Sequence, residues 1–416
     1  PAIPSNLFKE NDGFKVEFYD GQEFEGSPIE TKILKGNKFW AMGGFGLDIV
    51  AQSERPSLSV RFSGEIQPEY SGEYDFEIFS IGPSRLSING KNLIDNWTSQ
   101  EPGDAFFGMG SAPKRNKIKF QKGKTYSLEA EYKWEGRFPA VQIGMQAPDQ
   151  FDLMDEATSL ASESDAVILI VGTNSDWETE GNDRASLALP SNQDKLIEKI
   201  CNVNKNTVVV LNTGSPCEMP WSDNAEAILQ CWFPGQEFGN SLSDILFGEV
   251  NPSGKLPTTF PHKISDTPAY STYPGKDLQM DYEEGLFIGY RWYDKEKIKP
   301  LFPFGHGLSY TTFEYSNLRA IPPRGTSSVA AFEIDITNSG SLAGKEVVQG
   351  YISVSNSQID RPNKELKKFD KVFLKPGETK KVQFELSERD LSFWSIETQT
   401  WQVEPAEYIF EVGASA

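Results

Sequence analysis

Four carboxylates lie in one short segment of this sequence, residues 174–184, and make it suited to acid–base chemistry. They are accompanied by a tryptophan and an arginine: Asp176, Trp177, Glu178, Glu180, Asp183 and Arg184. A general acid must hold its proton near neutral pH, so its pKa has to be raised by burial or by neighbouring negative charge. Several acids beside a tryptophan could provide both conditions. The competing interpretation is a solvated acidic loop, because most charged segments of this kind are solvated surface.

The stretch that precedes this segment predicts a strand that holds it in place. Residues 166–171 are an unbroken apolar run rich in β-branched side chains, closed by Gly172. Such a run indicates a strand buried on both faces, as in a parallel sheet. Ligands of open α/β sheets bind beyond the carboxyl ends of the strands. We therefore predict the functional site in the loop that follows residue 172.

Further strands and helices alternate around this strand, which predicts a parallel α/β sheet. Ser191 is expected to cap a helix, with Asp194 three residues on and an apolar face at Leu196, Ile197 and Ile200. The predicted helix and strands beside it are residues 155–164, 207–212 and 227–232. Three strands are few for such a sheet. We expect more strands before residue 1.

Residues 1–148 alternate between polar and apolar side chains in short runs, which predicts an all-β domain. Residues 85–91 read as a strand that enters an Asn-Gly turn, a strong hairpin signal. The segments 70–76 and 86–91 resemble the PA14 family, a β-sandwich or β-barrel module that often handles carbohydrate.

Large aromatic residues stand beside glycines in two stretches of this β region. They are Phe39, Trp40, Phe106 and Phe107. Aromatic faces on flexible loops suit stacking against sugar rings, so these residues are candidate substrate contacts. They could equally cap the core of the β domain, and the sequence leaves both interpretations open.

Several long motifs follow residue 230, at residues 233–240, 244–257, 282–285, 290–293 and 302–310. Together they resemble the glycoside hydrolase family 3 β-glucosidases. In family members that contain PA14, this module is inserted within the α/β sandwich domain, which would account for the few strands. Without the resemblance, these glycine- and proline-rich stretches read as turns and helix ends, and His306 as a lone loop histidine.

The resemblance implies a multidomain chain of mixed α/β and β class. A PA14-like β domain is expected over 1–148, the second part of an α/β sandwich over 149–300, and a linker with a fibronectin type III-like β-sandwich over 301–416. The last domain shows renewed β alternation and is expected to have a packing role.

The resemblance also assigns roles within the acidic segment. The family's acid/base lies in a Glu-Gly-x-Asp-Arg segment, which makes Glu180 the expected catalytic acid/base. Glu178 is the alternative, two residues away on the same loop. Asp183 and Arg184 are expected to support the loop through charge-assisted hydrogen bonds. Hydrolysis with retention needs two carboxyl groups about 5 Å apart and no cofactor.

The second carboxylate, the nucleophile, comes in this family from an N-terminal (β/α)8 barrel that the sequence does not contain. The expected partner is therefore that barrel portion, as a companion chain or a missing segment, and the opening at Pro1 is compatible with an upstream part. The implied substrate is a terminal, non-reducing β-D-glucosyl residue, with β-xylosides as an alternative. The rival interpretation is a non-catalytic carbohydrate-binding protein that uses the PA14 loops.

Composition excludes several other classes of function. A net charge of −20 argues against binding to nucleic acid. No apolar run approaches the roughly 20 residues of a membrane span. Three cysteines and two histidines show no metal-ligand spacing, and we interpret the cysteines as unpaired thiols.

Localisation and oligomeric state stay open. Unpaired thiols favour a reducing compartment such as the cytoplasm, while the glycosylation sequon at Asn96 weakly favours secretion. Homo-oligomerisation is not decided by the sequence.

Overall fold

A computed structural model describes most of the chain. The chain forms two compact units, Pro1–Glu156 and Ala157–Ala416. The described residues are 3–9, 13–35, 38–40, 57–103, 105–135, 139–148, 153–174, 177–180 and 183–416.

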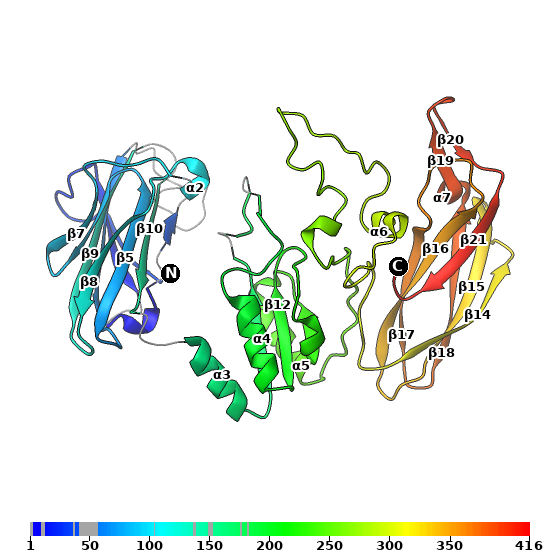
Figure 1. Ribbon diagram of the computed structural model, residues 1–416, viewed down its shortest axis with the longest axis horizontal. Helices are drawn as coiled ribbons and strands as arrows, with labels where there is room; N and C mark the ends of the chain where they lie inside the picture. The colour runs from blue at the N-terminus through cyan, green and yellow to red at the C-terminus, as the bar shows by residue number, and fades with distance from the viewer. Residues whose placement is uncertain are drawn as a thin grey trace. The chain divides into compact units, whose positions relative to one another are not determined.

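The first unit is built from two antiparallel sheets, as the alternating sequence predicts (Figure 1). One sheet has, in spatial order, β2 (Glu30–Leu34), β1 (Phe14–Asp20), β4 (Ser57–Ile66), β9 (Tyr126–Glu135), β6 (Ser84–Ile88) and β7 (Lys91–Asn96). The other has β3 (Lys38–Trp40), β10 (Ala140–Gln146), β5 (Gly72–Ile81) and β8 (Lys114–Phe120). Two short helices, η1 (Ser5–Leu7) and α2 (Ala105–Gly108), complete it.

The core of this unit consists of the inward-facing side chains of both sheets. Tyr74, Phe76 and Ile78 of β5 alternate with partly exposed residues and are buried. The predicted Asn-Gly hairpin is confirmed, because β6 and β7 pair antiparallel with Asn89 at φ 50° and Gly90 at φ 73° between them. Positive φ at both central residues is what a two-residue type I′ hairpin requires.

The asparagine of the glycosylation sequon is buried in this unit. Asn96 is 0% exposed, and its Nδ2 donates to the hydroxyls of Ser80, Ser84 and Ser111 at 3.2, 3.0 and 3.0 Å. An enzyme cannot reach this amide in the folded chain.

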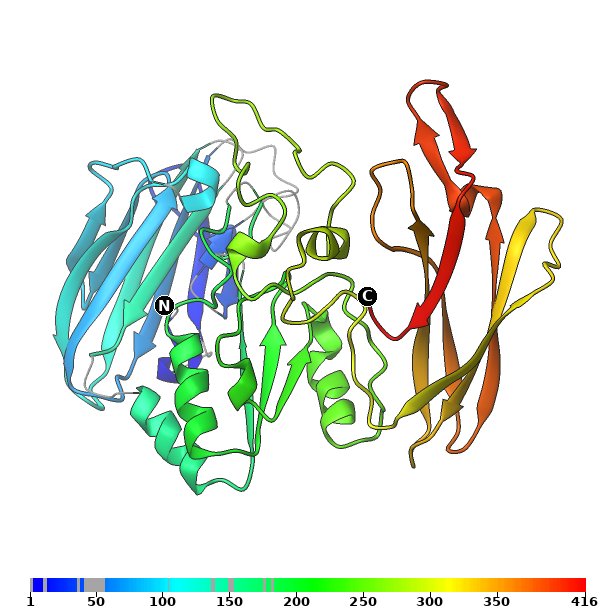
Figure 2. The same cartoon turned by 45° about the vertical axis from the view of Figure 1, so that its right-hand side comes forward.

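The second unit begins with a three-stranded parallel sheet. Its strands β11 (Val167–Gly172), β12 (Thr207–Asn212) and β13 (Ala227–Gln230) follow each other in sequence order. Figures 1 and 2 show the sheet between α4 and α5. The accompanying helices are α3 (Leu153–Glu163), α4 (Gln193–Val203), η2 (Ser222–Asn224), η3 (Gly235–Glu237), α5 (Phe238–Leu246), η4 (Ile264–Asp266) and α6 (Tyr290–Glu296).

Two details of the sequence prediction for this sheet are wrong. Strand β11 is an edge strand and is not buried on both faces, because Ile168 and Ile170, which share one face, are 49% and 52% exposed. Ser191 does not cap α4, since it has φ 56° and Asn192 is at the N-cap. The carboxylate of Asp194 instead accepts a hydrogen bond from the Trp221 indole at 2.8 Å.

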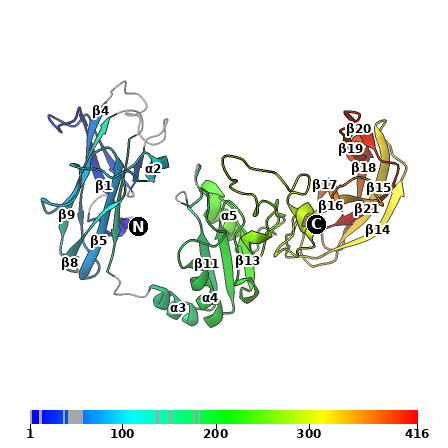
Figure 3. The same cartoon turned by 45° about the horizontal axis from the view of Figure 1, so that its top comes forward.

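The C-terminal part of the second unit is a sandwich of two three-stranded antiparallel sheets. The sheets are β14 (Phe313–Ile321), β15 (Ser328–Asn338) and β18 (Thr379–Ser387), and β17 (Glu365–Leu374), β16 (Gly344–Ser355) and β21 (Glu407–Gly413). Helix α7 (Glu388–Leu391) leads into a hairpin of β19 (Ser392–Ser395) and β20 (Thr400–Val403), which lies at one end of the sandwich (Figure 3).

Two motifs of the sequence join the parallel-sheet part to this sandwich. The backbones of Leu256 and Gly305–His306 exchange hydrogen bonds, both at 2.8 Å. Lys255 Nζ donates to the carbonyl of Gly307 at 2.9 Å and pairs with Glu346 of β16 at 3.2 Å. These glycine- and proline-rich stretches therefore have structural roles at the junction.

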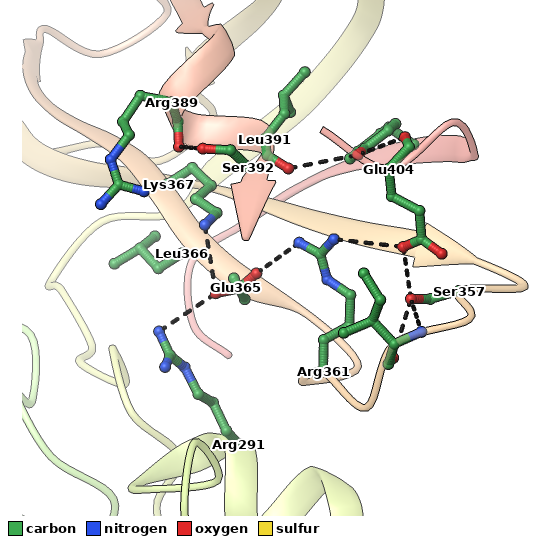
Figure 4. A network of polar contacts seen from close by, with 12 residues as sticks. Arg291, Ser357, Arg361, Glu365, Leu366, Lys367, Arg389, Leu391, Ser392 and Glu404 are labelled. Atoms are coloured by element: carbon green, nitrogen blue, oxygen red, sulfur yellow. Dashed lines mark hydrogen bonds and ion pairs between the residues drawn. The ribbon is translucent and has the colours of Figure 1, made fainter. Parts of the chain in front are cut away.

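A second ionic network crosses the same junction (Figure 4). Arg361, only 8% exposed, lies between Glu365 at 3.1 Å and Glu404 at 3.9 Å, and Arg291 of α6 approaches Glu365 to 3.8 Å. Burial opposes ionisation of Glu365, but the cations around it outweigh burial and lower its pKa. The carboxylate therefore stays charged and keeps α6 attached to the sandwich.

Candidate active site

The loop after β11 begins with a tight turn. The amides of Trp177 and Glu178 both donate to the carbonyl of Asn174, at 3.0 and 2.9 Å. The turn leaves the indole of Trp177 38% exposed. Asp176, one of the four predicted carboxylates, lies outside the described residues.

Glu178 is held by groups from two strand ends. Its Oε1 accepts a hydrogen bond from Thr173 Oγ1 at 2.5 Å and another from the amide of Gly214, just after β12, at 3.1 Å. Arg184 Nη1 lies 3.8 Å from the same oxygen. The carboxylate is thus engaged within the protein.

Arg184 extends this network to the next loop. Its Nη1 donates to Ser215 Oγ at 2.7 Å, and its Nη2 lies 3.4 Å from the carbonyl of Ala188. The side chain is 12% exposed. Arg184 therefore connects the loop after β11 to the loop after β12.

Glu180 differs from Glu178 in its surroundings. It is exposed and makes no hydrogen bond or ion pair with any residue that the structure describes. Its carboxylate is free to contact a molecule outside this chain. The two glutamates of the segment are therefore not equivalent.

Asp183 lies beside a residue that the sequence analysis did not identify. Tyr273 donates a hydrogen bond to the Asp183 carboxylate, which raises the pKa of the tyrosine hydroxyl. Tyr273 belongs to the long segment between η4 and α6, which the sequence motifs did not connect with the site. Thr173 and Gly214 were also missed, although both directly follow predicted parallel strands, whose ends share one edge of the sheet.

Comparison with known proteins places this arrangement in a family. The Glycosyl hydrolase family 3 C-terminal domain matches residues 90–310. The chain belongs to glycosyl hydrolase family 3. A Fibronectin type III-like domain matches residues 346–416, in agreement with the sandwich predicted there.

Relatives of this family 3 chain carry the name β-glucosidase. A β-glucosidase of Rhizobium radiobacter is 36% identical over 413 residues, covering 96% of this chain and 50% of the relative. A β-glucosidase of Kluyveromyces marxianus is 37% identical over 423 residues, covering 98% and 49%. The chain spans about half the length of the curated relatives it matches.

The fold is similar to that of solved family members. The crystal structure of the Kluyveromyces marxianus β-glucosidase in complex with glucose matches with a TM-score of 0.86 and 34% identity, covering 98% of this chain and 49% of that one.

The predicted aromatic contacts of the first unit are only partly described. The ring of Phe106 is 8% exposed and packs 5.6 Å from the ring of Phe79. In this conformation Phe106 belongs to the core more than to the surface. Of Phe39, Trp40 and Phe107 the structure describes the backbone only.

The cysteines do not form an alternative centre in this family 3 chain. All three are free, and burial raises the pKa of Cys217 to about 12 despite the nearby Arg184. Such a thiol is not a nucleophile at neutral pH. No group of three or more His, Cys, Asp or Glu side chains in the described ranges could hold a metal ion. No helix among these residues is long and apolar enough to cross a membrane.

Proposed function

We propose that this chain carries the acid/base half of a retaining β-glucosidase site, with Glu180 as the acid/base. The substrate is a terminal, non-reducing β-D-glucosyl residue. Glu180 protonates the glycosidic oxygen as the bond breaks and then takes a proton from the water that releases the sugar. Both relatives named above carry the name β-glucosidase, which supports this substrate class.

The observation that carries the proposal is the contrast between the two glutamates. A general acid must reach the substrate, and the exposed, unengaged carboxylate of Glu180 can do so. Glu178 is tied to Thr173 and Gly214. Arg184 then supports the loop through Ser215, and Asp183 through Tyr273.

The nucleophile is proposed to come from an N-terminal (β/α)8 barrel outside this chain. The relatives are about twice as long as the part that matches. One face of β11, on which Ile168 and Ile170 are about half exposed, supports an upstream portion that packs there. Parallel sheets are normally covered on both faces.

The test compares wild type and Glu180→Ala in the chain assembled with its barrel portion. Loss of a general acid is expected to lower the hydrolysis rate by about 10²- to 10⁴-fold, and azide should restore part of it as an external nucleophile. A β-configured glucosyl azide would establish retention. Glu198→Ala, which removes an exposed carboxylate on α4, is the matched control and should leave activity unchanged. Unchanged activity of Glu180→Ala would disprove the assignment.

A further inference from the structure

Glu178 occupies a position where three groups from two loops converge on one carboxylate oxygen. Thr173 Oγ1 and the Gly214 amide donate to Oε1 at 2.5 and 3.1 Å, and Arg184 Nη1 lies at 3.8 Å. Thr173 follows β11 and Gly214 follows β12. The side chain therefore joins the carboxyl ends of neighbouring parallel strands.

The contact is shielded from solvent, which strengthens it. The side chains of Glu178 and Arg184 are 15% and 12% exposed. Charge-assisted hydrogen bonds in such a setting are stronger than neutral ones. Arg184 also donates to Ser215 Oγ at 2.7 Å, so both partners of the ion pair contact the loop after β12.

The backbone at residue 214 is adapted to this contact. A Cβ atom on Gly214 would collide with Oε2 of Glu178 and with the ring of Phe233. Both obstacles are side-chain atoms, and the Phe233 ring is 52% exposed. A larger residue at position 214 must therefore displace the glutamate, the ring or both.

We infer that Glu178 is a positioning residue, which clamps the loop after β11 onto the loop after β12 and so fixes where Glu180 lies. It does not exchange a proton with the substrate. This inference rests on the proposed function for its catalytic consequence, but the clamp itself can be tested without activity.

Hydrogen exchange of the isolated 416-residue chain tests the clamp directly. In Glu178→Ala the amide of Gly214 loses its acceptor, so exchange of the peptide that contains it should rise at least about 10-fold. Glu178→Gln keeps an acceptor oxygen and should retain most of the protection. Glu180→Ala is the matched control and should change nothing there. Equal exchange in wild type and Glu178→Ala would overturn the inference.

Two variants keep this test informative if Glu178→Ala does not fold. Thr173→Val removes a donor but leaves the glutamate, and Gly214→Ala places a Cβ atom against its carboxylate. Both should raise exchange in the loop after β12. Normal protection in both variants would likewise overturn the clamp.

Kinetics of the assembled enzyme distinguish a positioning from a catalytic role. Glu178→Ala should lower kcat/KM by between about 10- and 100-fold, with no rescue by azide and an unchanged basic limb of the pH profile. Glu178→Gln should recover most of this loss. An inactive Glu178→Gln, or rescue of Glu178→Ala by azide, would make Glu178 the acid/base and overturn the inference. If Glu180→Ala stays active while Gly214 protection depends on Glu178, the proposed function fails and the clamp stands.

Discussion

At the scale of single residues, His306 makes the stability of the second unit depend on pH, at the junction between its parallel sheet and its sandwich. Its ring stacks on Phe302 with centroids 5.2 Å apart. Burial, and then the charge of Lys255, lower its pKa below the ordinary value of 6.5. His306 therefore binds a proton less readily in the folded chain than in the unfolded chain. The stability from neutral His306 is fully present above about pH 6.5 and is lost as the pH falls toward the folded-state pKa.

We therefore expect His306→Gln to weaken the acid sensitivity of the chain. The free energy of unfolding, measured by urea titration between about pH 7 and pH 5, should fall less steeply in the variant than in wild type. His262→Gln is the matched control, because His262 is exposed. An identical pH slope in His306→Gln and wild type would show that His306 does not titrate with folding.

The sequence singles out the acidic segment as the candidate site, but it does not predict the different surroundings of the two glutamates. The acidic segment and its position after a strand pointed to Glu180 and Glu178 alike. What separates them is the amide of Gly214, which lies 36 residues away in sequence from Glu178. Local sequence pattern contains no information on such a contact. Tyr273, farther still along the chain, was missed for the same reason.

At the scale of elements, β11 shows how pattern and packing can disagree. An unbroken apolar run predicts a strand with two covered faces, and the strand is where it was predicted. Ile168 and Ile170, which share one face of this edge strand, are about half exposed, whereas Val210, the neighbour of Ile170 on the same face of the central β12, is completely buried. The apolar sequence of β11 is therefore typical of a strand with both faces buried, although the described residues leave one of its faces half exposed.

This contrast predicts different costs for similar truncations in the isolated chain. Leu211→Ala removes a buried side chain and should cost about 2–5 kcal/mol of the free energy of unfolding. Ile168→Ala removes a half-exposed one and should cost about 1 kcal/mol or less. Denaturant unfolding measures both. Equal costs in the isolated chain would contradict the half-exposed face of β11. In the assembly with the barrel portion, Ile168→Ala should become clearly destabilising.

At the scale of the whole chain, the three predicted segments appear as two compact units. Sequence motifs separated the parallel sheet from the C-terminal sandwich because their hydrophobic periodicities differ. They could not show the buried contacts that join the two parts, such as Lys255 with Glu346 and Arg291 with Glu365. The packing role expected of the sandwich is consistent with these contacts.

The Lys255–Glu346 pair predicts that the parallel sheet and the sandwich depend on each other for stability. The side chains are 12% and 6% exposed, so Glu346→Ala leaves a shielded ammonium group without its partner and should cost about 3–5 kcal/mol. Lys380→Ala, which breaks a more exposed pair with Glu378 at 3.5 Å (side chains 43% and 34% exposed), is the control and should cost about 1 kcal/mol or less. Thermal unfolding, with hydrogen exchange read in both parts, measures the effect. Glu346→Ala should raise hydrogen exchange in the Gly254–Leu256 backbone as well as in β16, because Lys255 contacts both. Faster exchange in β16 alone would show that the two parts unfold independently.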